Sequence, residues 1–391
     1  DGVLDGSSNC PVVRIVNNRP DAAALARVFA DDNCFSYQEM FPGGFTPQFG
    51  GDVKDYSAIV GIRGQTEKRV SWGASAGFGS NEVQFFIDNT VNASLGPDSP
   101  TLFDPGLYRQ EEINLNLRAG YPVSSSVHLA GGLEWRDEKF TIGVGQTESW
   151  VNGPFADQGF SAASNGFPGF APISGGNWSR SNFAGYVDLE AGRGSNWTLG
   201  AAARFEHFAD FGSTLNGKLS GRYEFNPNFA VRGSVSTGFR APTPGQSNAY
   251  NVSTQFDLTL MDLVNNGTIP SISRVAALRG GKALEAEKSR NYSAGFILRG
   301  GRVSLTTDFF RVDLRDRLAV TQNFALTPAE VQGLLAWAAD QPRPVLEIEV
   351  RSVPRDPARA ARSAGRAGFA VLQARDQRLE EDLVEAQLAG R

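Results

Sequence analysis

Apolar and polar residues alternate along the chain from about residue 52 to about residue 317. In the segment Arg109 to Tyr121, Ile113 and Leu115 share one face, whereas Glu112 and Asn114 share the other. The same period of two recurs in residues 127–138, 183–190, 197–206, 215–225 and 231–240. A strand with this pattern has one face in an apolar medium and the other in a polar one. The pattern therefore predicts an all-β, antiparallel protein.

Three features of these segments favour a membrane-spanning β-barrel over a soluble β-sandwich, which would show the same period. Most segments run about ten residues or longer, the length that a tilted strand needs to cross a bilayer. The polar faces carry charges of both signs, which suits a water-filled lumen. Aromatic residues also gather at the segment ends, as in the girdles of such barrels: Trp72, Tyr108, Tyr121, Trp135, Trp178, Trp197 and Tyr223.

The connections between these segments alternate between short and long. Short connections lie at residues 64–68, 122–126, 192–195, 226–228 and 299–302. Long connections, rich in Gly, Pro, Asn and Ser, span about 35–51, 94–107, 141–177 and 241–283. Short periplasmic turns at one end and long extracellular loops at the other are typical of bacterial outer-membrane barrels. The spacing therefore supports a barrel independently of the alternation.

Composition and charge narrow the class further. The 391 residues include 44 Gly and 27 Phe, and the formal net charge of −5 argues against a nucleic-acid partner, which needs a basic footprint. No run of 18 or more apolar residues occurs, so a membrane protein of this sequence must cross with strands. The chain begins at Asp1 without an initiator Met or an apolar leader, and we expect no signal peptide in this sequence.

Two cysteines, Cys10 and Cys34, lie in a polar stretch rich in Pro, Asn and Asp. They fit a loop disulfide in an oxidising compartment, and two unrelated thiols are the alternative. Neither a Cys-X-X-Cys pair nor a Cys/His zinc pattern occurs. Between the cysteines, the segment Arg19 to Ala30 is expected to form a short helix.

The period of two stops near Trp337, and Arg, Ala, Pro and Glu dominate the remaining sequence. Residues 337–391 are therefore expected to form a tail outside the barrel. One interpretation is a solvated helix or a disordered tail. The interpretation that we favour is a reading frame lost near Ala336, because GC-rich coding sequence that is read out of frame often has this composition.

Six segments, taken in order, resemble the barrel strands and loops of the TonB-dependent outer-membrane receptors. They are Asn33 to Asp52, Tyr108 to Leu117, Gly131 to Arg136, Ser236 to Gln246, Leu284 to Phe296 and Asp308 to Leu318. The resemblance covers about residues 9–336, and the shared order of the six segments makes it specific. It also favours the disulfide between Cys10 and Cys34.

The resemblance implies a fold and a function. The fold is a transmembrane β-barrel fragment in the bacterial outer membrane, with roughly 11 of about 22 strands. Residues 1–51 would form an extracellular loop, residues 52–336 the barrel region, and residues 337–391 the tail. The function would be active transport of a scarce nutrient, such as a ferric siderophore, vitamin B12 or an oligosaccharide, and not catalysis.

The implied partners are the nutrient, outer-membrane lipid and TonB of the inner-membrane energy-coupling complex. In the family, TonB acts through a plug domain and a TonB box that precede the barrel. Neither is visible in this sequence, and the final barrel strands are not visible either. We therefore expect an internal fragment, which on its own would leave strand edges unpaired.

The strand exit Ser236 to Gln246 contains the motif on which the resemblance depends most. Its residues are Phe239, Arg240, Pro242 and Pro244. The prolines cannot donate to a β-ladder, so they end the strand and set the direction of the loop. Glu287 and Lys288 lie where the chain re-enters the barrel, and we expect a contact with the Arg240 region. A structural exit is favoured over direct ligand contact.

Residues that could support catalysis or bind a metal are sparse, and we expect no catalytic residue, metal or cofactor. His128 lies close to Ser124–Ser126, and His207 lies beside Glu206 and near Asp210. A serine nucleophile needs a base, an orienting group and an oxyanion site, and no third group is evident. Structural roles are expected for both histidines. Aromatic residues of the long loops could stack on a ligand, although loop packing is favoured: Trp150, Phe155, Phe160, Phe167, Phe170 and Phe256.

Two alternatives from other classes remain. One is a passive outer-membrane porin of about 12 strands, a number within the range of known barrels. The other is a secreted β-rich adhesin, whose apolar faces would pack against a second sheet.

Overall fold

The computed structural model covers the 391-residue chain and describes most of it. The described residues are 10–16, 19–192, 194, 196–248, 250–257, 262–321, 324, 326–339, 347–350 and 370–373.

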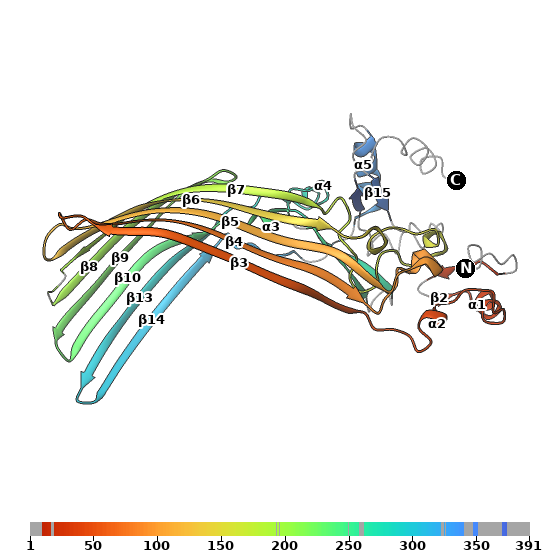
Figure 1. The fold of residues 1–391 in the computed structure, drawn as a ribbon, viewed down its shortest axis with the longest axis horizontal. Helices are drawn as coiled ribbons and strands as arrows, with labels where there is room; N and C mark the ends of the chain where they lie inside the picture. The colour runs from red at the N-terminus through yellow and green to blue at the C-terminus, as the bar shows by residue number, and fades with distance from the viewer. Residues whose placement is uncertain are drawn as a thin grey trace.

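Long antiparallel strands form one curved sheet that dominates the molecule (Figure 1). Its ten strands are β3 (Gln48–Gln65), β4 (Ser71–Asp88), β5 (Leu102–Pro122), β6 (Val127–Val144), β7 (Gly176–Ala191), β8 (Trp197–Phe208), β9 (Gly212–Asn226), β10 (Phe229–Arg240), β13 (Glu287–Gly300) and β14 (Val303–Arg315). Neighbours pair in chain order, except that β10 pairs with β13. The all-β prediction is confirmed, although the sheet has ten strands against the roughly 11 expected. Within the described residues, β3 and β14 are its edges and do not close it.

Shorter elements lie outside this sheet. Before β3 come β1 (Ile15–Val16), β2 (Arg19–Pro20), α1 (Ala22–Phe29) and α2 (Tyr37–Met40). Between β10 and β13 lie α3 (Pro244–Asn248), β11 (Asn251–Asp257), β12 (Asp262–Thr268) and α4 (Arg274–Ala277). After β14 come α5 (Pro328–Ala339), β15 (Glu347–Val350) and β16 (Ala370–Gln373). Among the described residues, no helix combines the length and the hydropathy needed to cross a bilayer.

The helix predicted between the two cysteines is present as α1. The carboxylate of Asp21 caps it by accepting hydrogen bonds from the backbone N–H groups of Ala23 and Ala24, both at 2.9 Å. These bonds satisfy amides that have no partner within the first turn of a helix. Ala24 and Val28 form the buried side of the helix.

The two ends of the sheet differ in the length of their connections. At the short-turn end, the strands are joined through residues 66–70, 123–126, 192–196, 227–228 and 301–302. At the long-loop end, the connections are residues 89–101, 145–175 and 241–286. The connection between β8 and β9 is an exception, because residues 209–211 make a tight turn at the long-loop end. The predicted asymmetry is otherwise present.

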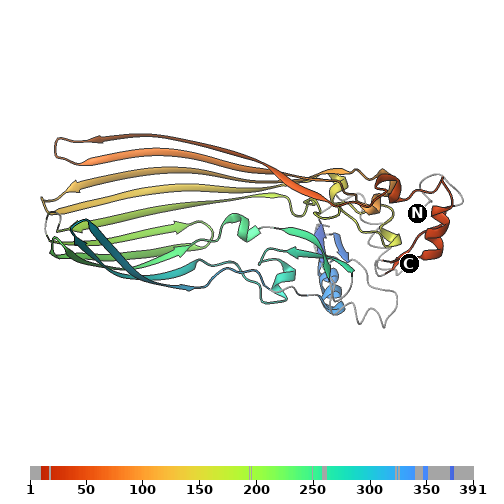
Figure 2. The ribbon, with the colours of Figure 1, turned by 90° about the horizontal axis from the view of Figure 1, so that it is seen from below.

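The two faces of the sheet differ in polarity. We call the face on which α3 lies the inner face. A Cβ added at Gly245 of α3 would contact the Phe140 ring of β6 at 3.4 Å, so α3 packs on the same face as Phe140. Figure 2 shows α3 between the two arms of the curved sheet. On β5, Asn114 and Asn116 belong to this inner face. Leu115 and Leu117 belong to the opposite, outward face and are 46% and 56% exposed.

The outward face carries an exposed apolar belt with a polar border. Towards the long-loop end, the outward side chains of successive strands change from apolar to polar. The polar residues at this border are Ser80, Glu111, Asp137, Ser181, His207, Ser213, Thr237, Arg290 and Arg311. Water would make so much exposed apolar surface unfavourable, whereas a bilayer makes it favourable. The face is therefore built to contact lipid.

Buried packing is concentrated at the long-loop end, outside the sheet. Val13, Ala24, Val28 and Cys34 form one cluster around α1. A second cluster joins α4 to α5 through Val275, Leu326 and Leu334. These clusters give the segments at the long-loop end cores of their own, apart from the sheet.

The predicted tail, residues 337–391, lies mostly outside the described residues. The described part comprises the end of α5 and the antiparallel pair of β15 and β16. A reading frame lost near Ala336 therefore stays a prediction.

Candidate functional site

The strand-exit motif contacts side chains of two other strands, β8 and β13, and leads into α3 on the inner face. Phe239 packs edge-to-face on Phe208 of β8, with ring centroids 5.8 Å apart. Arg240 Nε lies 3.2 Å from Glu287 Oε2, so the expected contact between these regions is present. Pro242 and Pro244 are buried, and α3 begins at Pro244. We call residues 241–248, which run from the end of β10 through α3, the exit segment.

Arg180 of β7 holds the exit segment against the sheet. Its guanidinium donates hydrogen bonds to the backbone carbonyl of Pro242 and to the carboxylate of Glu138 on β6. Its side chain is only 4% exposed. A buried guanidinium requires such partners, because a charge removed from water without them is strongly unfavourable. The exit segment is therefore attached to the inner face by a charged hydrogen bond.

Aromatic rings and a second carboxylate surround Arg180. Its guanidinium carbon lies 5.2 Å from the centre of the Phe208 ring and 5.9 Å from that of Phe211. Asp210 Oδ2 lies 3.5 Å from one guanidinium nitrogen. Phe211 and Asp210 belong to the tight β8–β9 turn, which is short enough to leave room for the exit segment to reach β6 and β7.

Ion pairs continue from Arg180 along the inner face. Arg136 lies 3.2 Å from both Glu134 and Glu138, and Arg204 lies 2.9 Å from Glu134. Arg204 also donates to Glu206 at 2.6 Å. We call this set the inner-wall network: Glu112, Glu134, Arg136, Glu138, Arg180, Arg204, Glu206 and Asp210. These ion pairs hold its charges in a fixed pattern, and five carboxylates against three guanidinium groups leave an excess of two negative charges.

Two buried oxygen atoms beside this network lack a hydrogen-bond partner among the described residues. They are Asn182 Oδ1 and Thr214 Oγ1. Both flank Glu206: Asn182 Nδ2 donates to its Oε2 at 3.1 Å, and Thr214 lies opposite it in the ladder. Unsatisfied buried polar atoms are unfavourable unless water or a ligand reaches them. A water molecule that reached this part of the wall would satisfy them.

A row of aromatic rings crosses the inner face near the long-loop end. Neighbouring rings from β3 to β7 lie 5.4–6.4 Å apart in the order Phe49, Phe85, Tyr108, Phe140 and Trp178. Phe167 and Phe170 of the β6–β7 connection stack on the row, 4.2 Å from Phe49 and 4.8 Å from Tyr108. Both loop residues pack the loop onto the wall, the role that was favoured over ligand stacking. Phe155 is also buried, at 2% exposure, and the side chain of Phe256 lies outside the described residues.

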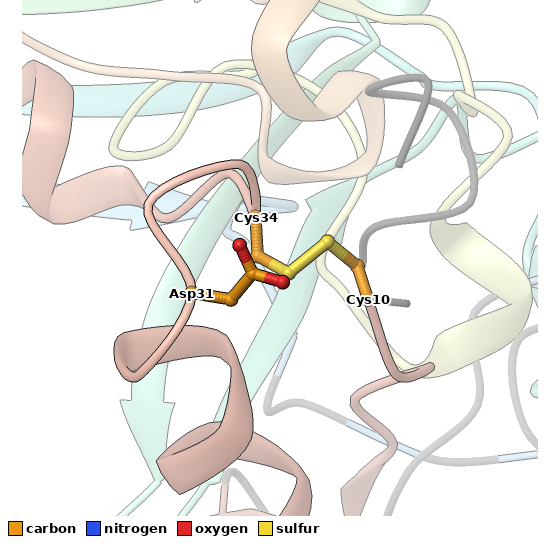
Figure 3. Close-up of side chains that lie close together, drawn as sticks. All are labelled: Cys10, Asp31 and Cys34. Atoms are coloured by element: carbon orange, nitrogen blue, oxygen red, sulfur yellow. A yellow bond between two sulfur atoms is a disulfide. The ribbon is translucent and has the colours of Figure 1, made fainter. Parts of the chain in front are cut away.

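The two cysteines are joined to each other in the structure (Figure 3). Cys34 is buried beside α1, and the carboxylate of Asp31 lies within 4.8 Å of both sulfur atoms. Because the sulfurs are bonded to each other, they are not available as thiolate ligands. This group is the one cluster of potential metal ligands found among the described residues, and its geometry is that of a cross-link.

The two histidines lie on opposite faces of the sheet, His128 on the inner face and His207 on the outward face. His207 Nδ1 lies 2.9 Å from Ser213 Oγ on the outward face, whereas Glu206, the preceding residue of the strand, points inward. Ser124 Oγ accepts a hydrogen bond from the backbone of Ser126 within the β5–β6 turn. Among the described residues, no carboxylate is hydrogen-bonded to His207, so the pair of His207 and Ser213 lacks the third group that orients a catalytic base.

Neither Arg180 nor Glu138 is marked as a site residue by the sequence. The alternation does place both on the polar face of their strands, so their orientation is predictable. Their burial depends on Pro242, which is 62 positions away from Arg180 in the sequence. No local signal encodes that contact.

Comparison with known proteins gives a family. The family model described as "TonB dependent receptor-like, beta-barrel" matches residues 16–334. The vitamin B12 transporter BtuB of Vibrio cholerae is 27% identical over 132 residues, which are 34% of this chain and 17% of that protein. The iron-regulated outer membrane virulence protein of the same species is 33% identical over 64 residues, 16% of this chain and 10% of that protein.

Solved structures with a similar backbone fold include a ferric enterobactin receptor and a siderophore receptor. A mutant of the ferric enterobactin receptor PfeA from Pseudomonas aeruginosa has a TM-score of 0.47 and 14% identity, over 67% of this chain and 35% of that one. PirA from Acinetobacter baumannii has a TM-score of 0.45 and 14% identity, over 68% and 35%. In each of these comparisons, this chain covers at most 35% of the relative's own length. Because the family model matches most of its length, the chain belongs to the TonB-dependent receptor family of outer-membrane β-barrels.

Proposed function

We propose that the chain forms part of the barrel wall of an active-transport receptor for a scarce nutrient. The observation that carries this proposal is the match of residues 16–334 to the receptor barrel. Ferric siderophores, vitamin B12 and oligosaccharides are the ligand classes to test. Names of relatives support the first two, since one is a vitamin B12 transporter and others are siderophore receptors.

The inner face supports this function through its chemistry. The inner-wall network places charged side chains of both signs on the inner face, beside the attached exit segment. A nutrient that crosses the barrel would exchange its hydration shell for such groups. The long loops above the wall would select the nutrient, because binding residues concentrate on loops held by a rigid scaffold.

We propose TonB as the partner that supplies energy. In this family the coupling passes through a plug domain and its TonB box, so contact with TonB would lie outside the barrel wall described above. The ion-paired inner wall would face the plug, and its mixed charges suit a polar interface that must open and close.

Uptake with and without TonB tests the proposal. Bacteria that carry the natural gene would receive radiolabelled ferric siderophore, cyanocobalamin or an oligosaccharide, with matched strains lacking the gene or lacking TonB. We expect accumulation of one ligand class to fall to background in both deletion strains and after collapse of the proton-motive force. Accumulation that needs the gene but not TonB would instead establish the passive porin.

The adhesin alternative requires a second sheet over the outward apolar face. In the described part of the chain, the side chains of that face are exposed and the main sheet stands alone. The adhesin therefore has no support in the described part of the chain.

A further inference from the structure

A hollow of about 550 Å³ lies at the short-turn end of the inner face. Each of the strands β3 to β7 contributes to it one inner-face side chain that carries a hydrogen-bond donor. In strand order, these side chains are Arg63, Ser71, Arg118, His128 and Tyr186. We call these residues the basic hollow. The short turns of an outer-membrane barrel are periplasmic, so the hollow lies at the periplasmic end of the wall.

Gly73 of β4 separates the two arginines of the hollow. In the register, Gly73 lies opposite Arg63 of β3 on one side and opposite Arg118 of β5 on the other. Neighbouring strands are about 4.8 Å apart, so the backbones of the two arginines are separated by about 10 Å. A Cβ at Gly73 would lie 3.0 Å from Arg118 Nε, which shows that this side chain lies over the glycine. Both guanidinium groups therefore border the space above Gly73.

The other donors of the hollow also surround glycines. A Cβ at Gly120 would lie 2.9 Å from Ser71 Oγ and 3.5 Å from His128 Nε2. A Cβ at Gly132 would lie 2.9 Å from the Tyr186 ring carbon that carries the hydroxyl group. The floor of the hollow thus has no side chains of its own, and polar groups stand around it.

The positive charge of the hollow is not balanced by its neighbours. Among the described residues, no carboxylate forms an ion pair with Arg63 or Arg118, and both side chains are exposed. Glu190 lies opposite His128 in the ladder, and Asp188 lies two residues before Glu190. Both carboxylates are exposed, and neither lines the hollow. Two guanidinium groups are therefore available to an anion from solution.

Other arginines of the inner face are arranged differently. Arg222 and Arg232, which lie near the same end of the wall, are paired with Glu224 and Asp308. The inner-wall network, nearer the long-loop end, has an excess of negative charge. The two unpaired arginines beside a common glycine thus distinguish the hollow from the paired arginines of this face.

We propose that the basic hollow binds the phosphate or carboxylate group of a small anionic solute. Arginine presents N–H donors in a planar fork that fits the oxygens of either group. An anion above Gly73 would neutralise two guanidinium groups that otherwise repel each other. The volume of the hollow lies within the roughly 300–1,000 Å³ of small-molecule sites. Such a site would concentrate anions at the periplasmic end of the wall. The inference goes beyond transport, because binding here requires only the folded wall and not TonB.

Isothermal titration calorimetry tests the proposal on the protein expressed from the natural gene and purified in a non-ionic detergent. The probes are glycerol phosphate and glycerate, with glycerol as their neutral match. We expect both anions to bind and glycerol not to bind. Arg63→Gln with Arg118→Gln should weaken anion binding about 20-fold, since each of two exposed ion pairs contributes up to about fivefold. Binding of only one anion would support the site and assign it to that group.

A matched control separates this site from the general charge of the wall. Arg222→Gln with Arg232→Gln removes the same number of cations from the inner face and should change anion binding less than twofold. Circular dichroism of both variants checks that the sheet is retained. If the Arg63 and Arg118 variant does not fold, the comparison of the three solutes on the unaltered protein still decides. Equal binding of glycerol and the anions, binding of none of the three, or equal loss in both variants would overturn an anion site in the hollow.

Discussion

At the scale of single residues, Arg180 shows how a long-range contact gives a strand residue its role. Its neighbours Glu138 and Pro242 come from β6 and from the exit segment, so no local pattern marks it. The expected contact of Arg240 with Glu287 could be predicted, because a strand exit and a strand re-entry must meet at one rim. Contacts at the rim follow from the order of the strands, whereas the contacts of Arg180 depend on how the exit segment folds onto the inner face.

Replacement of Arg180 should release the exit segment. In Arg180→Met, the carbonyl of Pro242 and the carboxylate of Glu138 lose a buried partner, although Glu138 keeps Arg136. We expect a loss near the lower end of the ~3–5 kcal/mol typical of a broken buried pair. Hydrogen exchange of residues 241–248 and urea unfolding in detergent would measure it. Arg222→Met is the control, because its pair with Glu224 is about one third exposed and should contribute at most about 1 kcal/mol. Equal effects of the two substitutions would contradict the proposed attachment.

The ion pair between Glu330 and Arg279 should make the packing of α5 sensitive to acid. Hydrogen bonds from Arg279 and Thr327 lower the pKa of Glu330 from 4.5 to about 2. Because the pKa is lower in the folded state, the stabilisation is complete above about pH 4.5 and disappears as the pH falls towards 2. Hydrogen exchange of residues 328–337 across this range should show the loss. Glu330→Gln should remove the pH dependence, and an unchanged profile in that variant would count against the pair.

The cross-link between Cys10 and Cys34 should stabilise the segment that precedes β3. It closes a loop of 24 residues around α1, so reduction should cost the segment about 2–4 kcal/mol. Peptide mapping without reductant should recover the two cysteines in one cross-linked fragment. Protease sensitivity near α1 should then rise equally in Cys10→Ser and in Cys34→Ser. Two free thiols in the native protein would contradict the cross-link.

At the scale of elements, the strands were the most predictable part of the molecule. An alternation with a period of two determines which side chains face lipid. Each stretch between two successive turn signals is long enough for about one strand. The segments at the long-loop end were less predictable, because their order comes from contacts between loops. Tyr37 illustrates this: its hydroxyl donates to the backbone carbonyl of Ala93 at 2.7 Å and thereby joins α2 to the β4–β5 connection.

Substitution of Gly96 would measure how tightly these loops are packed. Its φ of +60° favours glycine, and an added Cβ would lie 2.2 Å from the ring of Phe155. Gly44 has a φ of +78° but open space around it. Gly96→Ala should therefore destabilise the protein by about 2 kcal/mol more than Gly44→Ala, since only the first adds a steric clash to the backbone strain. Thermal unfolding of the two variants in detergent measures the difference. Matching stabilities would show that Phe155 does not pack on Gly96.

At the scale of the whole molecule, the main feature is the division of the sheet into two faces: an outward face in lipid and an inner face in water. The sequence predicts this division, and the register of the ten strands carries it from edge to edge. The curvature of the sheet and the inward course of the exit segment come from tertiary contacts and could not be predicted from the alternation. Transport and the attachment of the exit segment to the inner face both require that division.

Cysteine labelling on β5 in intact outer membranes tests this division most directly. Single substitutions would be made at Asn114 and Asn116 on the inner face and at Leu115 and Leu117 on the outward face. The two natural cysteines are bonded to each other and should stay unlabelled. A water-soluble maleimide should label Asn114→Cys and Asn116→Cys, whereas Leu115→Cys and Leu117→Cys should react only after the membrane is dissolved in detergent. Equal labelling of all four positions before detergent is added would contradict a membrane-spanning barrel wall.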